Sequence, residues 1–398
     1  MEPIPRYRWV ILTASSVILA VTMGQLVNGL SVYFVPIEVS EGWTRGEIAL
    51  INTCGLVGLG LGSIVMGYAA EKFGTRPVVL LGITATGLAT LVASSGTELW
   101  QFYVAIFFAG ALGGGAISAP TMALVGNWFT RGAGLALGIV AAGQAVGQGG
   151  VPFIGAFLIE GLGWRGAMMA QGVATLVILL PLGLLMRAPP GVASHGALSD
   201  ETPSGLPNTL ITMWIAVATV FCCVCMAVPL MHLVPLIQGR GFAGPEAGSV
   251  LFLMLIAAIF GRVAFGKLAD MIGALPAYLT ASAWQTVLAF GFVFLDRLET
   301  FYVYSAIYGF GYAGVMTTVF VTARNLTAPA RRASSLGIIL AFAYAGHGLG
   351  GWQGGHFFDV TDAYDWSFAN AAIAGVINLA IVFALWLTIN RQPRALSV

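Results

Sequence analysis

The sequence predicts an all-α membrane protein with twelve transmembrane helices, arranged as two pseudo-symmetric six-helix bundles. Of its 398 residues, 58% are hydrophobic and only 8% are charged, whereas a soluble domain carries about 25% charged residues. Twelve apolar runs are long enough to cross a bilayer, which takes about 20 residues each. The two halves of the chain also repeat one another at a constant offset, which predicts two bundles of the same design.

The twelve runs follow one another with short connections. They are Trp9–Pro36, Gly46–Ala70, Val78–Ser95, Leu99–Gly126, Ala133–Ile159, Ala167–Met186, Leu210–Ile237, Gly248–Ala269, Leu275–Leu295, Phe301–Ala323, Ala333–Phe358 and Ser367–Ile389. The first run is too long for the apolar part of a signal peptide, so we expect it to remain as a spanning helix. The one long polar interval, Arg187–Asn208, is rich in Pro, Gly and Ser, which is typical of a linker. We therefore expect an N-terminal bundle at 1–187, a cytoplasmic linker at 188–208 and a C-terminal bundle at 209–398.

The basic residues of the short loops predict the orientation. With the N-terminus inside, the cytoplasmic set is Arg6, Arg8, Lys72, Arg76, Arg131, Arg187, Lys267, Arg324, Arg331, Arg332, Arg391 and Arg394. The outer set is only Arg45, Arg165, Arg240 and Arg297. Both termini are therefore expected in the cytoplasm of a protein of the cell's inner (plasma) membrane. The net charge of +1 gives no reason to expect a nucleic acid partner.

The four cysteines, Cys54, Cys222, Cys223 and Cys225, all lie in apolar runs, so they do not indicate a disulfide framework. The i,i+3 spacing of Cys222 and Cys225 suits a metal in principle, but no His or acid stands at a helpful spacing beside them. We expect them to pack as small apolar groups. The sequence shows no metal cluster, no cofactor motif and no nucleophile–base pair, so an enzyme is not expected.

A shift of 199 residues aligns the first half of the chain with the second. The segment Gly62–Pro77 (GSIVMGYAAEKFGTRP) then matches Gly261–Pro276 (GRVAFGKLADMIGALP). Parallel repeats of six helices are a transporter architecture in which the substrate binds near the membrane midplane. Positions where the copies differ are candidates for chemistry: Arg262 matches Ser63, His232 matches Tyr33, and His347 matches Gln148.

Arg262 lies inside an apolar run, whereas these boundaries place every other Lys, Arg, Asp and Glu in a loop or near a membrane surface. An arginine in hydrocarbon costs roughly 2.5–3.5 kcal/mol on insertion scales and usually marks a functional site. A guanidinium matches a carboxylate in a two-pronged geometry and stays charged. Ala258 and Leu255 lie on the same helix face and predict an apolar slot for a small organic acid. The alternative is an Arg262 that extends to the nearby cytoplasmic surface.

The motifs GYAAEKFGTR and GKLADMIG resemble the loop 2–3 motif of the major facilitator superfamily and its second-half copy. The stretches Gly29–Leu50, Asn127–Gly143 and His232–Gly241, with the arginine of helix 8, resemble the monocarboxylate transporter family and its bacterial relatives, including the oxalate/formate antiporters. The resemblance covers nearly the whole chain. It implies the major facilitator fold and an Arg262 that pairs with the carboxylate of a substrate.

The chain departs from these relatives at three positions. Relatives carry a lysine where Asn28 stands, an aspartate where Ala258 stands, and often an acid near Gly239. Those groups are associated with proton coupling in the relatives. If protons move here, His232 or His347 must carry them, or the acid crosses with its own proton. Otherwise the chain is an exchanger or a facilitator.

Polar residues of helices 1, 4, 7, 10 and 11 are the further candidates for binding substrate: Asn28, Tyr33, Ser118, His232, Tyr312, Thr317, Tyr344 and His347. His232 lies between two prolines, which favour a broken helix that lines a cavity. It either binds substrate, carries a proton or bonds a carbonyl that a proline has freed. In oxalate/formate relatives a second cation on helix 11 is thought to meet a second carboxylate, and His347 lies in that helix. Single hydroxyls such as those of Ser118 and Thr317 usually bond their own helix.

A gate is predicted where helices 2 and 8 end at the cytoplasmic side. We expect Glu71 near the start of helix 11, at Arg331 and Arg332, and Asp270 near the start of helix 5, at Arg131. The helix dipole favours an acid at both places. Arg76 belongs to the same predicted gate. These contacts are expected to close the cytoplasmic side when the substrate cavity faces outward.

The sequence thus predicts a secondary carrier that moves a small carboxylate across a lipid bilayer by alternating access, either linked to protons or by exchange, and that works as a monomer. The alternative is a carrier of the same fold for a neutral or cationic compound, with a structural role for Arg262. The sequence does not choose among the small carboxylates.

Overall fold

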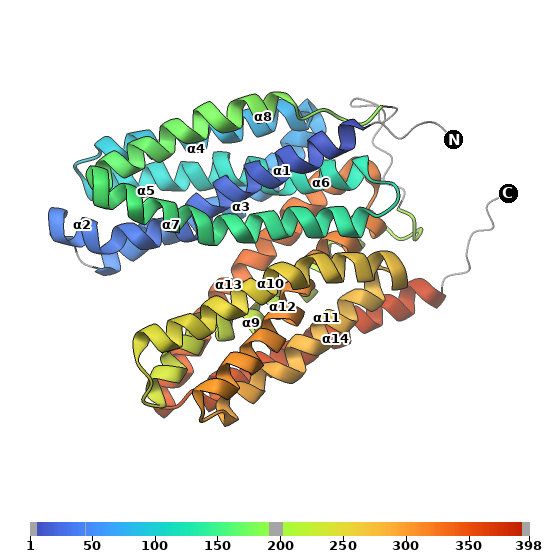
Figure 1. The fold of residues 1–398 in the computed structure, drawn as a ribbon. Helices are drawn as coiled ribbons and strands as arrows, with labels where there is room; N and C mark the ends of the chain where they lie inside the picture. Colours follow the sequence, from blue (N-terminus) through green and yellow to red (C-terminus); the bar gives the residue numbers. More distant parts are fainter. Residues whose placement is uncertain (1–5, 44, 191–201, 392–398) are drawn as a thin grey trace. The chain divides into compact units, whose positions relative to one another are not determined.

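The computed structural model describes residues 6–43, 45–190 and 202–391, and every regular element in these ranges is a helix (Figure 1). The chain forms two compact units. Unit 1 comprises Met1–Thr130, Ile139–Ser199 and Pro329–Ala341, and unit 2 comprises Arg131–Gly138, Asp200–Ala328 and Phe342–Val398. Each half of the sequence therefore contributes one short stretch to the unit formed by the other half. Most of the expected linker, residues 191–201, lies outside the described residues.

The first half of the chain forms helices that follow the predicted apolar runs. They are α1 (Tyr7–Met23), η1 (Gly24–Asn28), η2 (Gly29–Tyr33), α2 (Phe34–Glu41), α3 (Arg45–Phe73), α4 (Thr75–Ser95), α5 (Leu99–Phe108), η3 (Ala109–Gly114), α6 (Gly115–Trp128), α7 (Ala133–Ala174), η4 (Thr175–Leu179) and α8 (Leu180–Leu184). The turns η1, η3 and η4 are π-helical. They continue the axes of the flanking helices, so several elements together form one spanning segment.

The second half forms longer uninterrupted helices. They are α9 (Asn208–Gly239), α10 (Gly244–Ile272), α11 (Ala274–Ala289), η5 (Phe290–Phe294), α12 (Leu298–Leu326), η6 (Pro329–Arg331), α13 (Arg332–Thr361) and α14 (Asp365–Arg391). The glycines Gly74 and Gly273 precede α4 and α11 with φ values of 87° and 96°. These positive values favour glycine, and each glycine is the single residue between two helices, α3 and α4 or α10 and α11.

Eleven continuous helices in the described residues are long and apolar enough to cross a membrane, and the sequence predicts twelve spans. The difference lies in the Ala133–Leu184 segment, which is 52 residues long and holds two predicted spans. The predicted break between Ile159 and Ala167 lies at Gly163, with φ 70° and ψ 167°, where two helices meet at a kink, and it is shorter than expected because the residues on either side are helical. One glycine therefore makes the whole turn between the two spans.

A proline in α7 frees a backbone carbonyl that another helix then bonds. Pro152 has no N–H group, so the carbonyl of Gln148, four residues earlier, lacks its usual helical donor. The side-chain amide of Asn28 in η1 donates to that oxygen at 3.1 Å. The π-helical turn thus places Asn28 where it satisfies the carbonyl that the proline leaves open.

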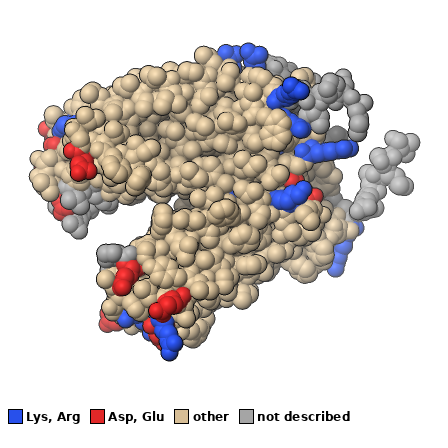
Figure 2. Space-filling model, in the orientation of Figure 1, with Lys and Arg blue, Asp and Glu red and all other residues tan. Residues whose placement is uncertain are grey.

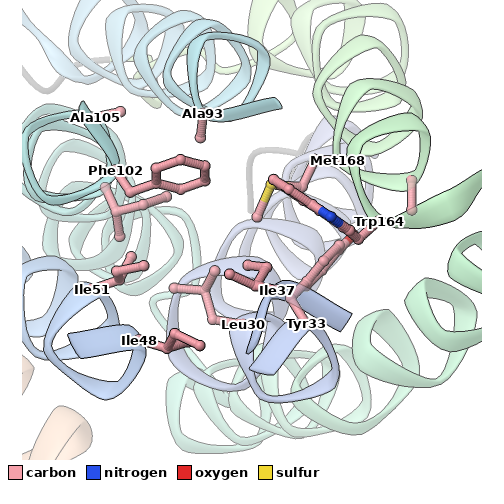
Figure 3. Close-up of a cluster of buried hydrophobic side chains, with 12 residues drawn as sticks. Leu30, Tyr33, Ile37, Ile48, Ile51, Ala93, Phe102, Ala105, Trp164 and Met168 are labelled. Carbon is pink, nitrogen blue, oxygen red and sulfur yellow. The ribbon is translucent and has the colours of Figure 1, made fainter. Parts of the chain in front are cut away.

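The core of unit 1 contains a cluster of buried apolar side chains (Figure 3). Leu30 and Tyr33 come from η2, Ile51 from α3, Phe102 from α5 and Trp164 from α7. Tyr33 is only 2% exposed, and Figure 3 shows its ring beside those of this cluster. Packing within unit 1 therefore fixes the end of the first spanning segment.

The core of unit 2 contains a chain of buried polar groups. The hydroxyl of Tyr278 on α11 donates to Oδ1 of Asn378 on α14 at 3.1 Å, and the amide of Asn378 donates to the hydroxyl of Ser282 at 2.9 Å. Gln285 of α11 donates to the carbonyl of Cys222 on α9 at 3.1 Å. Buried polar groups need such partners, and these bonds fix the register of α9, α11 and α14.

The charged side chains of each unit gather at its two ends on the face shown in Figure 2, and its surface between the ends is uncharged. Large apolar side chains cover that middle zone, including Phe153 and Phe157 of α7 and Phe252 and Phe260 of α10, each more than 60% exposed. Exposed aromatic and aliphatic groups in such numbers fit a lipid environment and do not fit water. The chain is therefore a multi-pass membrane protein.

Candidate functional site

Arg262 lies on the side of α10 that faces away from lipid. Phe260, two residues earlier, is 65% exposed, and two residues turn the helix by about 200°. Arg262 itself is only partly exposed, with a buried Nε atom. Tyr312 of α12 is close enough to interact with it electrostatically. The intramembrane cation is therefore directed into unit 2, where α10 packs along α12.

The ring of Tyr312 packs against further aromatic side chains. The rings of Tyr308 and Tyr312 are stacked, with centroids 5.3 Å apart and planes 14° apart. Phe292 then meets Tyr308 edge-on at 5.2 Å. Tyr308 and Phe292 are fully buried, so the ring beside Arg262 is held by a rigid column. Tyr312 was a predicted candidate for binding substrate, whereas Tyr308 was not, although its i−4 spacing from Tyr312 was a usable signal.

The two residues predicted to line an apolar slot beside Arg262 differ in burial. Ala258, one turn before the arginine, is 2% exposed, but Leu255 is 39% exposed and lies toward the outside of α10. Ala258 therefore belongs to the buried face with Arg262, and Leu255 does not.

The repeat places Arg262 at a close helix crossing that both copies contain. A Cβ atom added to Gly138 of α7 would lie 2.6 Å from the carbonyl oxygen of Arg262, within unit 2. In unit 1, a Cβ atom added to Gly337 of α13 would overlap the carbonyl oxygen of Ser63. Ser63 is fully buried, and its hydroxyl donates to Leu59 of its own helix at 2.7 Å. At this crossing, unit 1 therefore has a serine whose hydroxyl is hydrogen-bonded within its own helix, and unit 2 has an arginine.

His232 packs against α13 within unit 2. Its Nε2 atom lies 2.9 Å from the carbonyl oxygen of Gly351, so that nitrogen carries the proton and donates. The imidazole also lies against Gly354, where any Cβ atom would overlap it, and 5.5 Å from the ring of Tyr364. The acceptor is a carbonyl of α13 that no proline frees, since Gly355 follows Gly351 by four residues.

Tyr33, the repeat partner of His232, lies near the repeat partner of Gly354. Its hydroxyl lies 4.0 Å from a Cβ atom built on Gly155, and Gly155 and Gly354 are related by the same 199-residue offset. Tyr33 is surrounded by the apolar cluster of unit 1 and its buried hydroxyl has no hydrogen bond among the described residues. The imidazole thus packs tightly on Gly354, whereas Gly155 is approached most closely by the amide of Gln171 and only at 4.0 Å by the hydroxyl of Tyr33.

Two candidates on α13 lie on one face, as their spacing predicted. Tyr344 and His347 are both partly buried, and Tyr344 is close enough to Cys223 of α9 to interact with it. His347 makes no hydrogen bond within the described part of the chain, so its imidazole is available to a substrate or a proton. Asn28 is exposed apart from its bond to Gln148.

Ser118 of α6 and Thr317 of α12 differ from the expectation for single hydroxyls in spanning helices. Ser118 is 5% and Thr317 is 0% exposed, yet neither hydroxyl has a hydrogen bond among the described residues. The two positions are related by the 199-residue offset. Both units therefore hold, at this repeat position, a buried hydroxyl that can still bond a polar ligand or water.

Asp270, at the end of α10, caps the first turn of α7. Its two carboxylate oxygens accept the backbone N–H groups of Gly134 and Leu135, each at 2.8 Å. The predicted partner Arg131 is exposed and forms no ion pair among the described residues. Arg324 of α12 interacts electrostatically with Asp270 instead. The acid is thus held by backbone donors and a helix dipole, within unit 2.

Glu71 makes the equivalent contact in unit 1. Its carboxylate accepts the backbone N–H of Ser334, in the first turn of α13, at 2.7 Å, and lies 3.7 Å from the guanidinium of Arg331. Arg332, the other predicted partner, bonds the side chain of Asn127. Arg76 is exposed and takes part in no ion pair within the described ranges. Glu71 and Asp270 are one repeat apart, as are Ser334 and Leu135.

No group of three or more metal-ligating side chains occurs in the described residues. The cysteines behave as packing groups there: Cys222, Cys223 and Cys225 are buried in α9, and Cys54 is partly buried in α3. Unit 2 by itself offers the guanidinium of Arg262, the ring of Tyr312 beside it and the buried hydroxyl of Thr317 on the helix of Tyr312. A guanidinium with such neighbours can bind a small anion.

Comparison with known proteins gives a consistent family assignment. The sequence model of the Major Facilitator Superfamily matches residues 16–300 and 213–397. Monocarboxylate transporter 13 of Rattus norvegicus is 25% identical over 383 residues, covering 94% of this chain and 86% of the relative. Monocarboxylate transporter 2 of Homo sapiens is 21% identical over 398 residues, covering 91% and 81%. These relatives are transporters, not enzymes.

Solved structures show the same fold. The human organic anion transporter MFSD10 has a TM-score of 0.73 at 14% identity, covering 96% of this chain and all of the other. The E. coli fucose:proton symporter FucP has a TM-score of 0.72 at 12% identity, covering 94% and 98%. At these identities the likeness shows the fold alone.

Proposed function

Because the chain belongs to the Major Facilitator Superfamily, and is therefore a membrane transporter, we propose that it carries a small organic monocarboxylate by alternating access. The observation that carries this proposal is Arg262, a guanidinium in the middle of unit 2 whose neighbour is Tyr312. One guanidinium suits one carboxylate per substrate. The two monocarboxylate transporters to which the chain is similar support the same substrate class by name.

The surroundings of Arg262 suit a small substrate. Ala258 is a small residue on the buried face with Arg262, and the ring of Tyr312 bounds the guanidinium on α12. The Tyr308–Tyr312 stack is buried and rigid, so this boundary does not adapt to a larger acid. Thr317, on the helix of Tyr312, has a buried hydroxyl that can accept or donate a further bond.

His347 is the better of the two predicted proton carriers. His232 already donates to Gly351, and protonating its other nitrogen would add a charge to a packed helix contact. His347 has no hydrogen bond to lose in the described part of the chain. Asn28 and Ala258 supply no charge where relatives are coupled to protons, so the alternatives remain a symport through His347, entry of the neutral acid, or exchange.

The contacts of Glu71 and Asp270 are the proposed gate. Each acid binds the first turn of a helix. We expect both contacts, and both termini, at the cytoplasmic side of the inner (plasma) membrane, because basic residues are in excess in the loops of that side. Breaking the Asp270 contact is expected to bias the carrier toward the inward-open state. Cysteines introduced into the substrate cavity can be labelled from the outside. Unchanged labelling of these cysteines in Asp270→Asn would contradict this role.

The substrate proposal is tested by uptake into proteoliposomes. Labelled lactate, pyruvate, formate and oxalate are offered with and without a pH gradient, to the wild type and to Arg262→Lys. Lysine keeps the positive charge but lacks the planar guanidinium that donates two parallel hydrogen bonds to a carboxylate. Losing one charge-assisted bond costs about 1.5–3 kcal/mol, so uptake below saturation should fall roughly 10- to 100-fold.

Arg391→Lys is the matched control, because Arg391 is exposed at the end of α14. It should transport like the wild type. Equal uptake by Arg262→Lys and the wild type would rule out bidentate binding of a carboxylate by Arg262. It would favour the alternative, a carrier of a neutral or cationic compound in which Arg262 is structural.

A further inference from the structure

Arginines and aromatic rings gather at the end of unit 1 where α1 begins, and none of them is a candidate substrate residue. The arginine–aromatic cluster consists of Tyr7, Arg8, Trp9, Trp128, Phe129 and Arg187. Tyr7 donates to the carbonyl of Leu185 at 2.6 Å, and the indole of Trp128 donates to the carbonyl of Arg187 at 2.6 Å. These two bonds hold the start of α1, the end of α6 and the segment after α8 together.

The aromatic rings fix both guanidinium groups. Arg8 lies 5.2 Å from the ring centre of Trp9 and 5.5 Å from that of Phe129. Arg187 lies 5.7 Å from the ring centre of Tyr7. Cation–π contacts of this kind orient the groups without neutralising their charge. The two arginines therefore remain a pair of positive charges in defined positions.

Neither guanidinium has an acidic partner among the described residues, whose ion pairs involve other arginines. The Nε atom of Arg8 is buried and makes no hydrogen bond in the described part of the chain. A buried donor of a charged group that lacks an acceptor costs about 1–3 kcal/mol or more. Such a group calls for an anionic acceptor from outside the chain.

Apolar surface continues from the cluster toward the middle of the membrane. Trp9 is 51% exposed, Val10 is 38% exposed on α1, and Leu184 is 48% exposed at the end of α8. Trp and Tyr rings prefer the level of the lipid headgroups. Basic side chains also gather at this end of the unit in Figure 2. The charges thus lie at headgroup level with room for acyl chains below them.

We propose that the arginine–aromatic cluster binds the phosphate headgroup of an anionic phospholipid. Arg8 and Arg187 donate to the phosphate oxygens, which match the planar guanidinium fork. The acyl chains lie along Trp9, Val10 and Leu184. Basic pockets between spanning helices bind anionic headgroups in this manner. The site is separate from Arg262 and does not depend on which substrate is carried.

Native mass spectrometry of the purified full chain, titrated with phosphatidylglycerol or phosphatidylcholine, tests the proposal. Each basic residue near a membrane surface contributes about 1 kcal/mol. The double variant Arg8→Gln/Arg187→Gln should therefore bind phosphatidylglycerol roughly 30-fold more weakly. The single variant Arg187→Gln, at an exposed side chain, should lose about fivefold and serves if the double variant does not fold.

Lys267→Gln/Arg391→Gln is the matched control, since it removes two exposed positive charges that belong to unit 2. It should change phosphatidylglycerol affinity less than about threefold, because its charges lack the aromatic support. An equal loss in both double variants would overturn the site and leave these arginines as topology signals only. Equal affinity for the two lipids, or displacement of the lipid by glycerol 3-phosphate at the same concentration, would also overturn it.

Discussion

Replacing Asp270 by Asn should loosen the first turn of α7. The carboxylate accepts two backbone N–H groups, those of Gly134 and Leu135, at 2.8 Å each. Hydrogen bonds to charged groups contribute about 1.5–3 kcal/mol, and neutral ones about 0.5–1.5 kcal/mol. An asparagine oxygen can keep one neutral bond, and the favourable interaction with the helix dipole is lost. The expected loss is about 3 kcal/mol, or roughly 150-fold in the equilibrium between closed and open turns.

Hydrogen–deuterium exchange at the start of α7 measures this loss directly. The amides of Gly134 and Leu135 should exchange up to roughly 150-fold faster in Asp270→Asn, if exchange follows the local opening equilibrium. Lys267→Gln is the control, because Lys267 is exposed and lies three residues earlier on α10. The start of α13 should not change in either variant.

The repeat supplies a reciprocal experiment. Glu71 accepts one backbone N–H, from Ser334, and its distance of 3.7 Å from Arg331 makes a weaker ion pair. Glu71→Gln should therefore accelerate exchange at Ser334 by only about tenfold, and should leave the α7 amides unchanged. Unaltered exchange at Gly134 and Leu135 in Asp270→Asn, or equal acceleration there in Glu71→Gln, would refute the assignment of these contacts.

Two further substitutions address packing, each read from thermal unfolding of the purified protein. Gly354→Ala forces the imidazole of His232 away from α13 and should destabilise by about 1–3 kcal/mol; an unchanged melting temperature would show that His232 is not packed there. Asn28→Leu leaves the Gln148 carbonyl without its donor and should cost about 0.5–1.5 kcal/mol, because Asn28 is exposed and water can take its place. The control Asn28→Gln, a longer amide, should recover part of that loss, and equal stability of all three proteins would contradict the role.

The fold was predictable because it rests on patterns of composition and spacing. Run length identified the spans, and the constant offset identified the duplication. The break between Ile159 and Ala167 was predictable as well, because Glu160, Arg165 and several glycines interrupt the apolar run there. Only its length was not, since a single residue with positive φ, Gly163, replaces the longer loop that was expected. The π-helical turns of η1, η3 and η4 were not predictable either, since their residues are as apolar as their surroundings.

The candidate site was predictable at the level of charge but not of partners. Arg262 stood out because a cation in an apolar run is rare. The partner of Asp270 was sought among basic side chains, at Arg131, whereas the structure supplies the N–H groups of Gly134 and Leu135. Backbone donors are the same in every sequence, so only helix starts indicate them. The open carbonyl of Gln148, to which Asn28 donates, could have been predicted, because Pro152 follows Gln148 by four residues.

The equivalent helix crossings that hold Ser63 in unit 1 and Arg262 in unit 2 allow a controlled substitution. In unit 1 this position already functions with a short, neutral side chain whose hydroxyl is satisfied within its own turn. Arg262→Ser would give the second copy the chemistry that the first copy tolerates against Gly337. Folding of that variant should survive the change, so any transport it loses would report on anion recognition and not on collapse of the bundle. The duplication thus gives the molecule an internal reference for its own charged position.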